Sequence, residues 1–206
     1  MNNQLSQQEK EAVQERKNMC HVISNPVGYF HQLKHDPIIL KPLLFVIFLQ
    51  VILSFLNFNI EGEPDVGVAG WLLMSVFAGV SNVILLLLTA LLFRFFLYLL
   101  KNKTDYKRTL SVIVHAMIVL VVGMLISVIL SYLFGGPMHY YTSPLFLFEK
   151  GDFLYNLSVG LDIFTVWMFI LMGLGLKIVS GISSKKAFVF IFVLYLFSAL
   201  SAIFTT

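Results

Sequence analysis

Charge and cysteine are the two things that this sequence has little of. Its 206 residues include only 12% Asp, Glu, Lys and Arg, about half of the roughly 25% found in soluble domains. The single cysteine, Cys20, excludes an internal disulfide framework and any zinc or iron–sulfur site built from cysteines. Apolar residues are in excess, at 58% of the chain with a mean hydropathy of +0.87. This composition excludes a soluble domain and predicts an integral membrane protein with one polytopic domain.

Five long apolar runs divide the chain. Each is near or above the ~20 residues that cross a bilayer as a helix. They cover residues 38–58, 71–100, 110–134, 163–180 and 186–204. Their continuous apolar character excludes the alternating strands of a β-barrel. We therefore expect an all-α bundle of five transmembrane helices over residues 38–206, preceded by a cytoplasmic N-terminal segment over residues 1–37.

The basic residues predict the orientation of this bundle. Thirteen of the fourteen Lys and Arg fall before or at the entry of the first run, around the second connection or around the fourth. The first connection carries three acids and no base, and the third carries only Lys150. By the positive-inside rule the N-terminus is cytoplasmic and the C-terminus lies outside. Within the second run, Arg94 is expected to mark the cytoplasmic boundary by reaching toward the headgroups.

The N-terminal segment contains signals for two short helices. A capping box at Ser6 to Glu9 predicts a helix from Gln7 to about Ile23, which Asn25-Pro26 should end. A second helix is expected over residues 27–35, in the cytoplasmic interface, before Asp36-Pro37. The residues expected toward one side of it are Val27, Phe30, Leu33 and Lys34.

Catalytic motifs are missing from the sequence. No run matches H-E-x-x-H, G-x-S-x-G, a P-loop or G-x-G-x-x-G. We therefore expect no enzymatic activity, no cofactor and no metal. His31 and His35 are one helical turn apart and could both face a metal, but no third ligand accompanies them, so headgroup contact is the favoured interpretation.

Two polar residues in or beside the spans have alternative interpretations. His115 lies inside the third run, where it could titrate or bridge helices, or simply bond a neighbouring backbone group. Asp162 begins the fourth run, where a carboxylate caps a helix and matches its dipole. We favour the local hydrogen bond for His115 and capping over ion binding for Asp162.

Small residues recur at helical spacing in three runs. Such stripes let helix backbones approach closely in lipid. They are Ser75 and Gly79, then Gly123, Ser127 and Ser131, then Gly173 and Gly175. Packing within the bundle is the favoured use, and homo-oligomer formation is the alternative.

The third connection, residues 135–161, is rich in aromatic residues. Six Phe and Tyr residues stand among glycines and prolines, and so many aromatics are not expected to face water. We expect them to lie in the outer interface or to fold over the bundle as a lid.

The order of these features resembles the Yip family, the Ypt/Rab-interacting-type membrane proteins, in its bacterial branch. The resemblance runs from Asn25 to the C-terminus. The residues that carry it are Asn25-Pro26-Val27-Gly28-Tyr29-Phe30 with Pro37 and Pro42, Tyr106-Lys107-Arg108-Thr109-Leu110, Leu161 to Trp167, Gly173-Leu174-Gly175-Leu176 and Ser183 to Ala187. It implies five spans, a cytoplasmic N-terminus and a non-catalytic protein that works by contact with partners. The long acidic-aromatic N-terminal region of the eukaryotic members is missing, which argues against a small GTPase as partner.

These observations favour a scaffold or accessory protein of the bacterial inner membrane. Its expected partners are the lipid bilayer and other membrane proteins, such as a transporter assembly, with the basic loops near anionic lipid. Nucleic acid is not an expected partner. The alternative function is a small transporter or channel, which needs polar groups converging at mid-membrane; the candidates are Ser81, Asn82, Thr89 and His115.

Overall fold

A computed structural model shows an all-helical chain over the residues that it describes, which are 21–61, 67–136, 140–149, 154–155, 158 and 160–203. Most of the helix predicted from Gln7 lies outside these residues. The described helices are α2 (His21–Ser24), α3 (Pro26–His35), α4 (Leu40–Glu61), α5 (Gly67–Leu99), α6 (Tyr106–Phe134), the 3-10 helix η1 (Pro144–Leu147), α8 (Ile163–Ser180) and α9 (Ser184–Ile203).

Four of the described helices, α4, α5, α6 and α8, are long and apolar enough to cross a membrane. The ends of α4, α5 and α6 differ by up to four residues from the predicted runs, and α8 coincides with its run. The fifth predicted run is helical as α9, but its crossing of the membrane stays a prediction, as does the side on which each terminus lies.

The ends of α6 and α8 follow from local chemistry. Asp105 accepts a hydrogen bond from the amide of Arg108, which starts α6 one turn before the predicted Leu110. Asp162 caps α8 in the same way. Both helices stop at glycines with positive φ, +76° at Gly135 and +73° at Gly181, a conformation that side chains with a Cβ rarely adopt.

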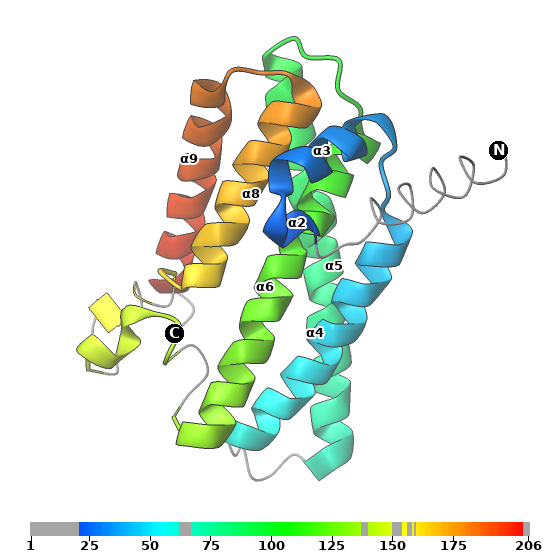
Figure 1. The fold of residues 1–206 in the computed structure, drawn as a ribbon. Helices are drawn as coiled ribbons and strands as arrows, with labels where there is room; N and C mark the ends of the chain where they lie inside the picture. Colours follow the sequence, from blue (N-terminus) through cyan, green and yellow to red (C-terminus); the bar gives the residue numbers. More distant parts are fainter. Residues whose placement is uncertain are drawn as a thin grey trace, which may run out of the picture.

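Helix α6 is the centre of the bundle. It packs against α3, α4, α5 and α8, and its hydrophobic stretch is 61% buried, compared with 22% in α4 and α5. Figure 1 shows α6 running diagonally between α4 and α8. A helix covered on most sides must be apolar around its circumference, as α6 is.

Two glycines determine the position of α8 relative to α6 along the bundle axis. A Cβ on Gly123 of α6 would collide with the ring of Phe164, and a Cβ on Gly175 of α8 would lie 2.5 Å from Cγ1 of Val112. Val112 and Gly123 are eleven residues apart, and so are Phe164 and Gly175. The helices are therefore antiparallel in constant register, and α8 begins beside about residue 124 of α6. The rest of α6, about ten residues or ~15 Å, extends beyond α8.

Helix α4 is displaced in the opposite direction. The hydroxyl of Ser111 in α6 donates to the carbonyl of Ile38, 2.8 Å away, just before α4 starts. Because α4 and α6 run parallel, α4 lies beside the later part of α6, out to its end. Figure 1 shows the pair α8 and α9 displaced along the bundle axis relative to α4. Each displacement leaves a stretch of α6 that one neighbouring long helix does not reach, α8 at one end of the bundle and α4 at the other. We call each of these two places a step.

Helices α2 and α3 fill one step. Asn25 ends α2 and caps α3 through the amide of Gly28, with Pro26 in the first turn. The buried face of this pair consists of Val22, Tyr29, Phe30 and Leu33. The orientation predicted for Val27 is wrong, since that side chain is exposed. The α3 face that packs on α8 and α6 is centred on Phe30, and Val27, three residues earlier, lies outside it.

The two basic connections lie side by side at one end of the bundle. The carboxamide of Asn102, after α5, donates to the carbonyl of Ser180 at the end of α8, 2.9 Å away. Nearby, Phe190 of α9 stacks on Phe96 of α5 at 3.8 Å between ring centroids. Figure 1 shows both connections at the top of the bundle. We call this the basic end.

The close approach at Gly175 gives the first prediction. Gly175→Ala places a Cβ within 3 Å of Val112 and Phe30 at once, and such overpacking costs about 1–3 kcal/mol. We expect a lower midpoint of thermal unfolding in detergent. Leu85→Ala on the exposed face of α5 is the control and should change the midpoint less. An equal or smaller loss for Gly175→Ala would contradict the register described above.

Candidate functional site

Two buried polar centres lie on α6, one at each step. The inner centre is formed by His115, Ser111 and Tyr29, and the outer centre by Ser127, Thr142 and Asp162. Every one of these residues except Thr142 is buried. Buried polar groups in a membrane protein depend on internal partners, and the two centres differ in how fully they supply them.

His115 is fully buried one turn after Ser111. Its Nδ1 lies 2.7 Å from the carbonyl oxygen of Ser111. Because a carbonyl only accepts, Nδ1 carries the proton and Nε2 of the neutral ring carries the lone pair. Nε2 has no hydrogen-bond partner within the described part of the chain. The ring of Tyr29 stands edge-on to the imidazole, 5.2 Å between centroids, so α3 covers this histidine.

Tyr29 belongs to α3, outside the membrane-spanning helices. Burial raises the pKa of Tyr29 from 10.0 to about 12, because the phenolate loses solvation against α6 and α8. The neutral phenol is therefore the form that the folded protein holds. This residue was quoted above only as part of the family resemblance, and its contact with His115 connects two segments that are far apart in sequence.

The outer centre is a chain of hydrogen bonds that ends on a carboxylate. The hydroxyl of Thr142 donates to Oδ2 of Asp162, and the hydroxyl of Ser127, 3.2 Å from Thr142 Oγ1, donates to it in turn. Oδ1 of Asp162 accepts from the amides of Phe164 and Thr165 at 2.9 and 3.0 Å. The carboxylate thus caps α8 and ties it to the segment before η1, which is the capping role favoured from the sequence.

The predicted small residues lie at helix contacts inside the bundle. Gly79 faces Val51 of α4, Gly123 faces Phe164 of α8, and Gly173 faces Phe188 of α9. Gly175 lies against both α6 and α3. Ser75 is buried and donates to the carbonyl of Trp71 at 2.8 Å, and Ser131 is buried near the end of α6. The structure brings Ser127 and Asp162 together through Thr142 and leaves His115 in a separate centre.

Two polar residues with a structural role were not recognised from the sequence. Thr142 gave no signal, because its role depends on Asp162, twenty residues away. Gln50 is buried in the middle of α4, and its signal was an uncharged polar residue within an apolar run. His31 and His35 are both exposed, and in the described part of the chain no group of three His, Cys, Asp or Glu residues could hold a metal.

These features define a membrane protein that is all-helical over the described residues, with four helices long and apolar enough to cross a membrane. The model of the Yip1 domain matches residues 20–205, and the chain belongs to the Yip1 domain family. No curated protein and no solved structure matches the chain.

The outer centre predicts a difference between two helix caps. Asp162→Ala removes a buried carboxylate that accepts hydrogen bonds from Thr142, Phe164 and Thr165, whereas Asp105→Ala removes an exposed cap. Loss of a cap costs roughly 0.5–2 kcal/mol, and Asp162→Ala should cost more because Thr142 also loses its acceptor. Thermal unfolding in detergent measures both. Equal losses would show that the bond to Thr142 contributes little.

The raised pKa of Tyr29 predicts a pH dependence. A folded-state pKa above the unfolded value stabilises the fold below pH 10, and this stability is lost as pH rises from about 10 to about 12. Tyr29→Phe should therefore flatten the fall in the unfolding midpoint over this range. Tyr141→Phe, at an exposed ring, is the control and should retain the wild-type profile. Identical profiles for Tyr29→Phe and the wild type would contradict the assignment.

Proposed function

We propose that this Yip1 domain protein is a non-enzymatic scaffold or accessory protein of the bacterial cell membrane, which binds other membrane proteins through the outward faces of its helices. A transporter assembly is one such partner. In this proposal the chain crosses the membrane five times, with α9 as the fifth span, a cytoplasmic N-terminus and the C-terminus outside. The family membership and the uneven burial of the helices support it.

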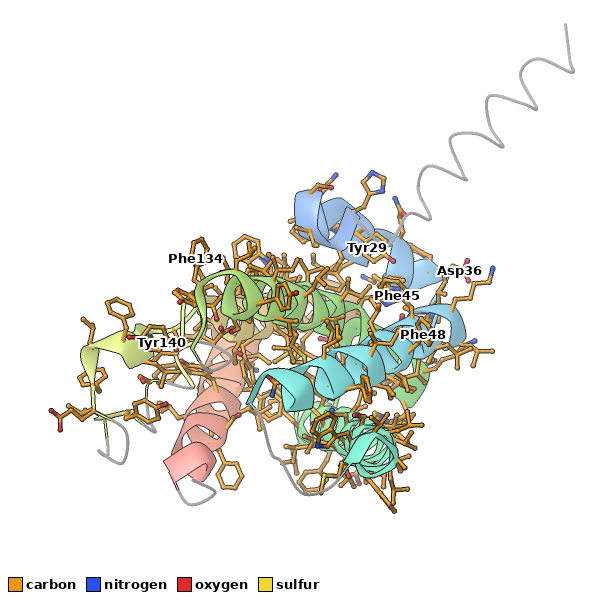
Figure 2. All side chains as sticks on the ribbon, turned by 90° about the horizontal axis from the view of Figure 1, so that it is seen from below. Tyr29, Asp36, Phe45, Phe48, Phe134 and Tyr140 are labelled. Carbon is orange, nitrogen blue, oxygen red and sulfur yellow. The ribbon has the colours of Figure 1, made fainter. Side chains whose placement is uncertain are left out.

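The uneven burial of the long helices is the main observation behind the proposal. Helices α4 and α5 leave most of their apolar side chains partly or fully exposed, whereas most of the hydrophobic stretch of α6 is buried. The glycines that allow close packing are occupied by internal partners. A partner helix would therefore meet the large side chains on α4 and α5. Phe48 of α4, which Figure 2 labels, is 66% exposed, whereas Val46, two residues earlier, is 1% exposed.

The basic end supports contact with anionic lipid around such an assembly. Lys101, Lys107, Lys177, Lys185 and Lys186 are exposed there. The described acids on this side are Asp36 and Asp105, and Asp105 lies 3.8 Å from Arg108. An unbalanced positive surface beside a bilayer gains about 1 kcal/mol per basic residue from anionic headgroups.

The unpartnered Nε2 of His115 favours a second candidate, a small transporter or channel. A transport path needs polar groups that converge. Gln50, the buried polar residue of α4, lies about eight residues along the axis from His115 in the register set by Ser111 and Ile38, or ~12 Å. Flux across reconstituted vesicles that His115→Phe and Asn82→Ala abolish would replace the scaffold proposal with this one.

A pair of crosslinking variants tests the scaffold. A photoreactive amino acid at Phe48, in the whole protein in its native membrane, should give an adduct with another membrane protein. The same amino acid at Val46 should give crosslinks only within the chain, because that position is enclosed. The proposal fails if position 48 yields lipid adducts alone or the same products as position 46.

A further inference from the structure

At the second step of the bundle, at the end away from the basic connections, an apolar segment reaches Ser127 and Asp162 through Thr142. We define the outer wedge as residues 140–148, which include η1. It has no charged residue. Figure 1 shows η1 below the lower ends of α8 and α9 and above the lower end of α6. Figure 2 shows the segment with Tyr140 on the flank away from α5.

The level of the wedge relative to the bilayer follows from the charges at the basic end. Lys177 of α8 falls beside about residue 110 of α6 in the antiparallel register, close to Arg108. These two cations mark one boundary of the hydrocarbon. The opposite boundary, ~30 Å away, then lies near residue 130 of α6.

Helix α8 stops short of that boundary. Between Lys177 and its first residue, Ile163, it has about fourteen residues, or ~21 Å. Helix α9 ends close to the same level, since the ring contact of Phe169 with Tyr195 sets an antiparallel register in which Ile203 falls only about two residues beyond the start of α8. On this flank, hydrocarbon of ~9 Å depth remains beyond the start of α8.

The outer wedge is held at this level by its two sides. Thr142 is bonded to Ser127 and Asp162, both inside the hydrocarbon boundary near residue 130, and its carbonyl accepts from the amide of Ile163 at 3.0 Å. Leu145 is 2% exposed and anchors η1 to the protein. The next two side chains point outward, with Phe146 at 59% and Leu147 at 63% exposed.

We propose that the outer wedge inserts into the bilayer beside α8 and α9, with Phe146 and Leu147 among the lipid acyl chains. An interfacial segment places its apolar face about 5–10 Å into the headgroup–acyl boundary, which matches the depth that α8 leaves open. Burial of two large apolar side chains in water-free surroundings is favourable. Glu149, exposed at the end of the wedge, returns the chain to the headgroups. On this flank, α8 thus spans only part of the hydrocarbon thickness, and the outer wedge covers the rest.

Tryptophan fluorescence in vesicles tests this depth. The full chain first receives Trp71→Phe and Trp167→Phe, which remove both native tryptophans, and then Phe146→Trp or, as the matched control, Glu149→Trp. The vesicles contain phosphatidylcholine brominated on its acyl chains. We expect Phe146→Trp to emit at shorter wavelength than Glu149→Trp, to lose more fluorescence to the bromines and to lose less to aqueous iodide.

Two outcomes would overturn the proposal. Strong quenching of Phe146→Trp by iodide would place the wedge in water. Protection from both iodide and bromine would mean that protein covers it, either a second copy or the rest of the loop. A cysteine variant gives an independent measurement if the tryptophan disturbs folding. In a Cys20→Ser background, Phe146→Cys should resist a water-soluble maleimide that labels Glu149→Cys, and equal labelling contradicts insertion.

Discussion

The close approach of α6 and α8 is the contact on which the rest of the structure depends. Glycine at 123 and 175 allows Phe164 and Val112 to enter the space that a Cβ would take. Inside a bilayer, helix association gains little from the hydrophobic effect, because lipid tails are as apolar as the side chains, and close packing of surfaces replaces it. Two such contacts on one pair of helices fix both the distance between the helices and their relative position along the bundle axis. A shift of one residue would bring bulky side chains into both positions.

The fixed level creates both steps, and polar groups are found where the steps are filled. At one step, α3 covers His115 with Tyr29, and at the other, the segment before η1 reaches Ser127 and Asp162 through Thr142. Irregular backbone at membrane depth is tolerated only where protein satisfies its polar groups. The cap on α8 meets this requirement for the outer segment, since one carboxylate serves two backbone amides and a hydroxyl. The inner step is filled mainly by apolar packing, with Phe30 against Gly175.

The sequence predicted where each long helix begins and ends, but not how the helices are displaced along the bundle axis relative to one another. Apolar runs and caps predicted α4, α5, α6, α8 and α9 within a few residues, because both depend on neighbouring positions. The small residues that prove to face other helices were also visible as spacing. The steps could not be predicted, since they depend on which side chain meets which glycine across the bundle. For the same reason Val27 was placed on the wrong face of α3, and Thr142 escaped notice. Periodicity within ten residues cannot say which face its partners will cover.

The distribution of polar groups also bears on how such a protein would hold a partner. The described carboxylate and hydroxyls of the outer centre are used internally, and the outward faces of α4 and α5 offer mainly large apolar side chains. Packing alone distinguishes one apolar partner from another poorly, since lipid competes for the same surface. Specificity would then require a second element at an interface, where charge and shape are not matched by lipid tails. In the proposed assembly, the exposed lysines of the basic end would supply such an element beside α5 and α8, and they would orient a partner that carries acidic residues at its own membrane boundary.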